Sequence, residues 1–93
     1  MARREYPFKL KNNLDRYLRV KQAKLTIERN QSLTLQDLYK EMAAYMGVTV
    51  NTVALIKANN YNPSVVVALA MAEFLGATVD ELFSIEPREV IGN

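Results

Sequence analysis

The chain is 93 residues long and 49% hydrophobic, which allows one domain with a modest core. It has neither cysteine nor histidine, which excludes zinc fingers, disulfide scaffolds and Cys- or His-based catalysis. No apolar run approaches the roughly 20 residues of a membrane span, and the charged N-terminus lacks an apolar signal segment, so a cytoplasmic location is expected. Residues 1–30 carry nine Lys or Arg and three acids, a net of +6, whereas residues 31–93 have a net of −4; this asymmetry indicates one electropositive face.

The sequence predicts an all-α fold of five helices with no strand. The first helix spans about residues 11–28, where leucines recur at the spacing of one helical face. Thr34 followed by Asp37 is an N-cap with an acidic third residue, and it opens a second helix that continues to Met46. The third helix spans about residues 50–58.

The fourth and fifth helices are predicted from capping residues at their starts. Asn62–Pro63 is a cap followed by proline at the first helical position. The helix from 64 to 75 is apolar nearly all round, so we expect it at the buried centre of the bundle. Gly76 ends it, and Thr78 with Glu81 forms a capping box for the fifth helix. The chain is thus expected to divide into a basic N-terminal arm at 1–10, a single domain at 11–85 and a flexible C-terminal tail at 86–93.

The segment that joins the second and third helices has the spacing of a helix-turn-helix. Two apolar residues lie one turn apart on its first helix, and a small residue beside them leaves room for another helix. Gly47 falls where that helix must end in the left-handed conformation, and Thr49 can cap the next helix. Such a pair presents its second helix to the DNA major groove. The pattern is carried by Met42, Ala43, Met46, Gly47, Val48, Thr49, Val53 and Ile56.

Residues 34–83 resemble the Cro/CI-type helix-turn-helix domain of phage repressors, the xenobiotic response element family. Residues 56–64 resemble the family's loop, which ends in Asn-Pro-Ser, residues 68–76 its fourth helix and residues 79–83 its short closing helix. The resemblance implies a five-helix, lambda-repressor-like fold. It also implies a sequence-specific transcriptional regulator, usually a repressor, that binds double-stranded DNA as a homodimer and is nucleoid-associated when bound. No residue pattern supports an enzyme, a cofactor or a metal site.

The chain departs from the family pattern in three places. The link from Arg19, the best match to an arginine in the family's first helix, to the second helix is longer than usual, so the first helix is expected to be extended. Tyr39 stands where the family commonly has glutamine; its hydroxyl can donate to a phosphate, but a bidentate contact to adenine is lost. The third helix also carries fewer polar side chains than the family usually places there.

The third helix is nevertheless expected to read bases. If Val53 and Ile56 point inward, the groove face holds Thr49, Val50, Asn51, Ala54 and Leu55 as candidate base contacts. Only Asn51 offers the paired donor and acceptor that read adenine, while the apolar side chains can touch thymine methyl groups. We therefore expect an A·T-favouring reader that depends on DNA shape. The candidate phosphate contacts are Arg3, Arg4, Arg19, Tyr39, Thr52, Lys57, Asn59, Asn60 and Tyr61.

Two other functions stay open. The apolar side chains of the third helix also suit a protein groove, which would make the chain a protein-interaction module, such as an anti-repressor or a modulator of another regulator. A non-specific architectural DNA-binding protein would show a steep salt dependence and little discrimination between sequences. The donors of residues 57–62, with no acid between Glu41 and Glu73, favour DNA. A dimer would form through the extended first helix or through residues 82–91.

Overall fold

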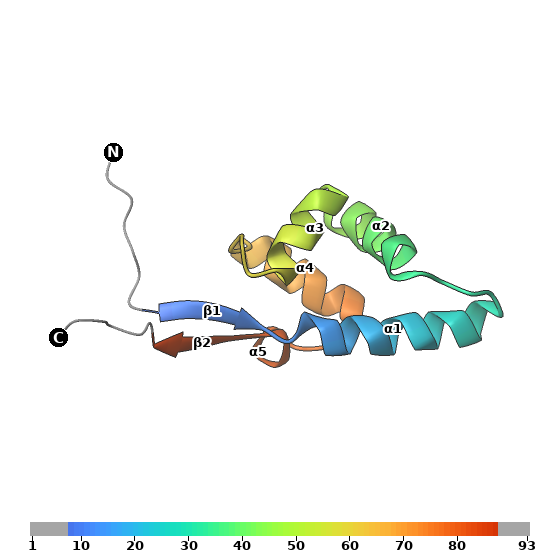
Figure 1. The fold of residues 1–93 in the computed structure, drawn as a ribbon, viewed down its shortest axis with the longest axis horizontal. Coiled ribbons are helices and arrows are strands. Elements are labelled where there is room, and N and C mark those ends of the chain that lie inside the picture. The colour runs from blue at the N-terminus through green and yellow to red at the C-terminus, as the bar shows by residue number, and fades with distance from the viewer. Residues whose placement is uncertain (1–7, 88–93) are drawn as a thin grey trace.

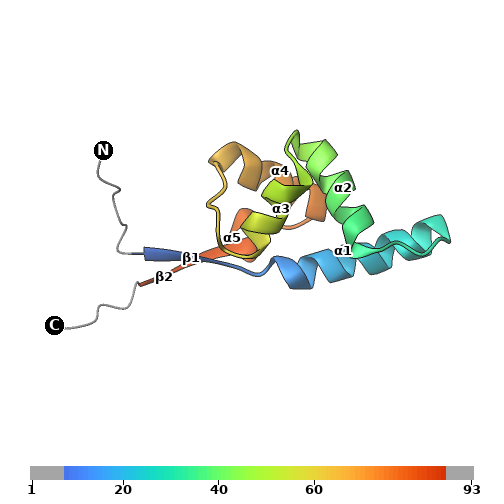
Figure 2. The ribbon, with the colours of Figure 1, turned by 45° about the horizontal axis from the view of Figure 1, so that its top comes forward.

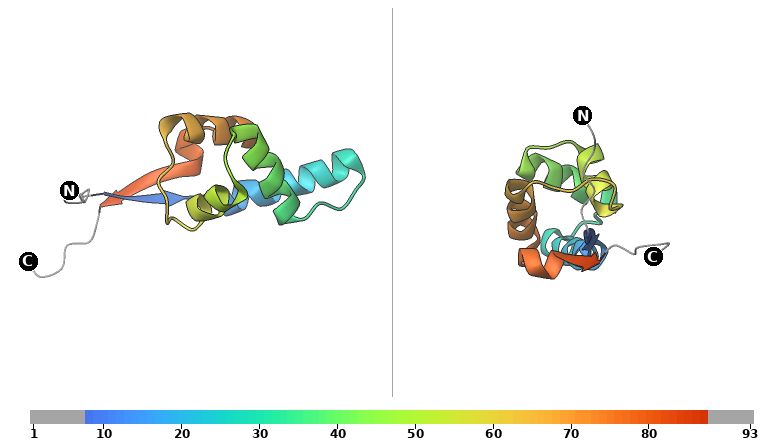
Figure 3. Two further views of the ribbon diagram at one scale, coloured as in Figure 1. Left: turned by 90° about the horizontal axis from the view of Figure 1, so that it is seen from above. Right: turned by 90° about the vertical axis from the view of Figure 1, so that its left-hand side faces the viewer.

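The structure, a computed structural model, describes residues 8–87. The elements in this range are β1 Phe8–Asn12, α1 Leu14–Arg29, α2 Leu35–Met46, α3 Val50–Lys57, α4 Val65–Leu75, α5 Val79–Leu82 and β2 Phe83–Pro87. Figure 1 shows α2, α3 and α4 on one side of α1, while the two strands lead away from the helices at the start of α1. In the end-on view of Figure 3 the helices surround a common centre, which the apolar core fills.

The core takes one face from each helix. Because α1 continues beyond this core, its Ile27 is 80% exposed, and the expected extension of the first helix is confirmed. Within residues 8–87, no helix has both the length and the apolar character needed to cross a membrane. The largest fully buried side chains are Leu14, Leu18, Leu38, Met42, Val53, Ile56, Met71 and Leu82.

The predicted helix ends are largely confirmed. The Thr34 hydroxyl accepts the N–H of Asp37 at 3.0 Å, and the Asp37 carboxylate accepts the N–H of Thr34 at 3.1 Å. The capping box of α5 at Thr78 is built in the same way. Gly47 and Gly76 end α2 and α4 with φ values of 72° and 68°, the left-handed conformation that glycine adopts without steric cost.

The prediction of no strand was wrong. Strands β1 and β2 pair antiparallel, with Leu10 opposite Ile85, and we call this two-stranded sheet the ribbon. Phe8, Lys9, Leu10 and Lys11 alternate apolar and charged side chains, which is the period of a strand. A four-residue alternation is a weak signal by itself, and the strand that pairs with this segment lies at the other end of the chain. The ribbon crosses both predicted domain boundaries, and α1 begins at Leu14 rather than near residue 11.

Two expectations for α4 were also wrong. Its N-cap is Ser64 rather than Asn62, because the Ser64 hydroxyl accepts the N–H of Val67 at 3.2 Å. Pro63 therefore precedes the cap. The helix is not buried all round, because only one of its faces meets the other helices. Its exposed side includes Val65, Val66 and Leu69, which are 75%, 76% and 56% exposed.

Candidate nucleic-acid interface

The turn between α2 and α3 fixes the direction in which α3 leaves α2. After Gly47, the N–H of Val48 donates to the carbonyl of Ala43 at 3.0 Å, and the Val48 side chain packs against the core. The Thr49 hydroxyl accepts the N–H of Thr52 at 3.1 Å and thereby caps α3. The capping role expected for Thr49 is confirmed.

Helix α3 buries one face and exposes the other. Val53 and Ile56 are 0% and 1% exposed, which confirms that they return to the core. Asn51, Ala54 and Leu55 lie on the exposed side, where the Leu55 side chain is 36% exposed. Three of the predicted base contacts therefore share one accessible face of a helix.

The other residues at the start of α3 are less free. Thr49 is exposed, but its hydroxyl also lies 3.0 Å from the hydroxyl of Thr52. Val50 is half-buried and packs against the core, so only part of its side chain faces outward. The amide of Asn51 makes no hydrogen bond within residues 8–87. The Asn51 side chain therefore keeps its hydrogen-bonding capacity for a partner.

Charged side chains meet beside the C-terminal end of α3. The carboxylate of Asp15, in the first turn of α1, lies 2.8 Å from Nε of Arg19 and 3.6 Å from Nζ of Lys57. The hydrogen bond from Arg19 is the main cause that holds the pKa of Asp15 below its ordinary value, and Lys57 acts in the same direction. We call these three residues the Asp15 cluster. It brings together two predicted phosphate contacts that lie on different helices.

The loop between α3 and α4 presents three more of the predicted contacts. Asn59 adopts the left-handed conformation with φ 62°, which asparagine tolerates better than most residues. Its N–H donates to the carbonyl of Ile56 at 3.0 Å, and the N–H of Asn60 donates to the carbonyl of Leu55 at 2.9 Å. The Tyr61 side chain is 49% exposed. The first residues of this loop are thus hydrogen-bonded onto the end of α3.

The remaining predicted phosphate contacts lie in different surroundings. Tyr39 is half-buried on α2 and packs against the core, so only part of its side chain is accessible. Thr52 is half-buried next to the cap of α3. Arg3 and Arg4 lie outside the described residues.

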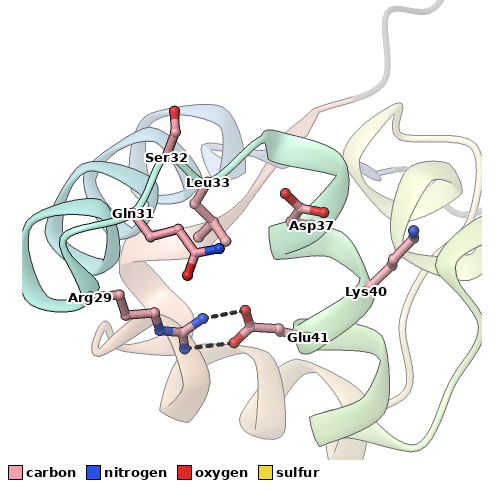
Figure 4. Close-up of a pocket in the computed structure, with 7 residues that line it drawn as sticks. All are labelled: Arg29, Gln31, Ser32, Leu33, Asp37, Lys40 and Glu41. Carbon is pink, nitrogen blue, oxygen red and sulfur yellow. Dashed lines mark hydrogen bonds and ion pairs between the residues drawn. The ribbon is translucent and has the colours of Figure 1, made fainter.

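A pocket of about 380 Å³ lies elsewhere, between the end of α1 and α2. Figure 4 shows that the Arg29 guanidinium faces the Glu41 carboxylate across it, with two hydrogen bonds of 2.6 and 2.8 Å. The bond from Arg29 is the main cause that lowers the pKa of Glu41. The pocket has no lining residue from α3, and its cations and acids balance. Its lining residues are Arg29, Gln31, Ser32, Leu33, Asp37, Lys40 and Glu41.

Sequence reasoning missed two residues at this interface, Asp15 and Asn12. The Asn12 amide donates to the carbonyl of Ile56, 44 positions away in the chain, at 3.0 Å. Asn12 lies one residue before the N-cap of α1, which is Asn13, so no capping pattern singles it out, and no local pattern reveals a contact at that separation. The contact of Asp15 with Lys57 is long-range for the same reason.

Comparison with known families agrees with this geometry. A family model described as helix-turn-helix matches residues 16–82, which is more than half of the chain and runs from α1 to the end of α5. No curated protein matches the chain. Because the family model covers more than half of the chain, the chain belongs to the helix-turn-helix family of the Cro/CI type, whose domains bind double-stranded DNA and regulate transcription.

Proposed function

We propose that this protein is a sequence-specific transcriptional repressor that inserts α3 into the major groove of DNA and binds as a homodimer. The observation that carries the proposal is the exposed face of α3, which has the unpaired amide of Asn51 on it and the cations Arg19 and Lys57 at its far end. An α-helix fits the major groove, and cations beside it can reach the flanking phosphates. The repressor would be nucleoid-associated in the cytoplasm when bound.

The base contacts follow from the accessible face of α3. The Asn51 amide can form a bidentate pair with adenine, in which its Oδ1 accepts a hydrogen bond from N6 and its Nδ2 donates one to N7. Ala54 and Leu55 can touch thymine methyl groups, Thr49 can reach a base or a phosphate, and Val50 contributes only its exposed part. With one bidentate contact per subunit, discrimination depends strongly on DNA shape and favours A·T pairs.

The phosphate contacts come from the surroundings of α3. The Asp15 carboxylate already pairs with both Arg19 and Lys57, so a phosphate that binds these cations competes with Asp15 for them. Such contacts fix the register of the protein on the duplex without reading sequence. The further contacts that we propose are Tyr39, Thr52, Asn59, Asn60, Tyr61 and, from the basic arm, Arg3 and Arg4.

The proposed dimer has two candidate surfaces within residues 8–87. Val20 and Ile27 are 61% and 80% exposed on the outer face of α1, and Ile85 is 62% exposed on the ribbon. Leu82 cannot contribute, because its side chain is fully buried in the core. Two copies would place two α3 helices on successive turns of a palindromic site.

A protein-interaction module is the second candidate, since Leu55 and Ala54 give α3 an apolar exposed stripe. The variant Leu55→Lys separates the two functions. A DNA-binding α3 retains or gains non-specific affinity with the added charge, whereas docking into an apolar protein groove is lost. Leu69→Lys adds the same charge at a more exposed leucine of α4 and is the matched control. Binding to random duplex DNA that falls only in Leu55→Lys contradicts the proposal that α3 lies in the groove.

A further inference from the structure

The junction between β1 and α1 touches the end of the recognition helix. We infer that Asn12, at this junction, is a positioning residue that sets the orientation of α3 on DNA and thereby its sequence discrimination. The inference rests on the proposed function, because it concerns how α3 is held while it reads bases. Figure 2 shows α3 above the point where β1 passes into α1.

The Asn12 side chain uses both ends of its amide. Its Nδ2 donates to the carbonyls of Ile56 and Lys57, at 3.0 Å each, and to Oδ1 of Asn59 at 2.8 Å. Its Oδ1 accepts the N–H of Leu14 at 3.0 Å. Two N–H protons serve three acceptors, so at least one proton is shared. Serine or aspartate at this position could keep the bond to Leu14, but neither could donate in the same way to the end of α3.

These bonds matter because α3 has only eight residues and cannot hold its own shape in isolation. A helix leaves its last carbonyls without partners inside the helix. At the end of α3, the carbonyl of Ala54 accepts the N–H of Ala58, and the carbonyl of Leu55 accepts the N–H of Asn60. The carbonyl of Lys57 accepts from Asn12 alone within the described part of the chain.

The junction that carries Asn12 is itself fixed. Asn12 is opposite Phe83 in the ribbon, and the N–H of the following Asn13 donates to the carbonyl of Leu82 at 2.8 Å. The start of α1, the end of α5 and the ribbon therefore meet at the residue that holds the end of α3. Asp15 adds its contact to Lys57 from the next turn.

The consequence for DNA binding is specific. If the end of α3 is released, Asn51 and Leu55 move relative to Arg19, which stays on α1. Base contacts tolerate such a shift poorly because they are directional, whereas phosphate contacts tolerate it. Loss of the Asn12 bonds therefore lowers affinity for the selected site more than affinity for random DNA.

The test compares Asn12→Ser and Asn12→Asp with Asn13→Ala, which changes a neighbouring exposed side chain that makes no cap bond. Affinities for the selected site and for random duplex DNA are measured on the full chain, at a temperature where circular dichroism shows each variant folded. We expect the ratio of the two affinities to fall about tenfold in both Asn12 variants, which corresponds to about 1.4 kcal/mol. Asn13→Ala should leave the ratio unchanged.

A ratio that does not change, or two affinities that fall together, overturns the inference and leaves Asn12 as a purely structural residue. A second measurement needs no DNA: residual dipolar couplings of the backbone amides give the orientation of α3 relative to α1. We expect Asn12→Ser to change or average this orientation while α1 and α2 keep theirs. If the unmodified protein prefers no sequence, the proposed function fails, and the couplings alone decide whether Asn12 holds α3; unchanged couplings overturn the inference.

Discussion

Removal of the Lys57 charge tests whether the end of α3 meets a phosphate. The ammonium of Lys57 is 3.6 Å from Asp15, and its side chain is 32% exposed, so it is held in place beside the recognition face. Each phosphate contact contributes about 0.9 to the slope of log affinity against log salt. Lys57→Gln should therefore reduce that slope by about 0.9. Between about 50 and about 200 mM salt, the variant should lose about 3.5-fold less affinity than the unmodified protein.

Asp15→Asn should strengthen DNA binding, whereas Lys57→Gln removes a phosphate contact. Asp15→Asn removes the anion that competes with phosphate for Lys57 and Arg19, so affinity for both selected and random DNA should rise. In the Lys57→Gln background the gain should be smaller, because one of the two cations that pair with Asp15 is already absent. The double-mutant cycle measures this coupling directly.

The assay is fluorescence anisotropy with a labelled duplex, titrated at several salt concentrations. Lys24→Gln is the matched control, because Lys24 is exposed on α1 and takes no part in the Asp15 cluster. An unchanged slope in Lys57→Gln would show that Lys57 does not bind phosphate. A loss of affinity confined to one DNA sequence would show a base contact instead.

Three further predictions concern the fold and the assembly. In Gly47→Ala the added Cβ atom meets no other atom within 4 Å, but the alanine must adopt φ 72°. The variant should therefore lose about 1–2 kcal/mol of unfolding free energy, measured as a lower thermal midpoint. An unchanged midpoint would contradict the left-handed turn. The hydrogen bond from Arg29 holds the pKa of Glu41 in the folded protein below its ordinary value of 4.5. The stability that this bond gives is therefore complete above pH 4.5, and it is lost as the pH falls through the lowered pKa of the folded protein. Because the chain has no histidine, its thermal midpoint should stay flat from about pH 6 to 8 and fall in acid. The fall should be less steep in Glu41→Gln, and an equally steep fall would contradict the role given to Glu41. Since a two-stranded ribbon is marginal alone, Ile85→Lys should dissociate the dimer in sedimentation velocity and Ile27→Lys should not; the reverse would place the interface on α1.

The parts of this fold that could be predicted are those with local causes. The capping boxes at Thr34 and Thr78, and the left-handed ends at Gly47 and Gly76, depend on residues within one turn of each other. The inward face of α3 likewise followed from helical spacing.

The parts that could not be predicted depend on contacts between distant residues. The ribbon needs both ends of the chain, and either strand alone is a short alternation. The exposed side of α4 was missed because an apolar sequence does not reveal which face finds a partner. Asn12 and Asp15 came to the interface because the junction between β1 and α1 lies against the end of α3. Candidate contacts could thus be named from the sequence, but not the residues that position them.

The most direct test of DNA reading by α3 is selection of binding sites from a random duplex pool, repeated with Asn51→Ala. We expect a palindrome that contains A·T pairs; Asn51→Ala should lose affinity for this site and keep its binding to random DNA. Enrichment of no sequence, or the same site selected with equal affinity by Asn51→Ala, would contradict it.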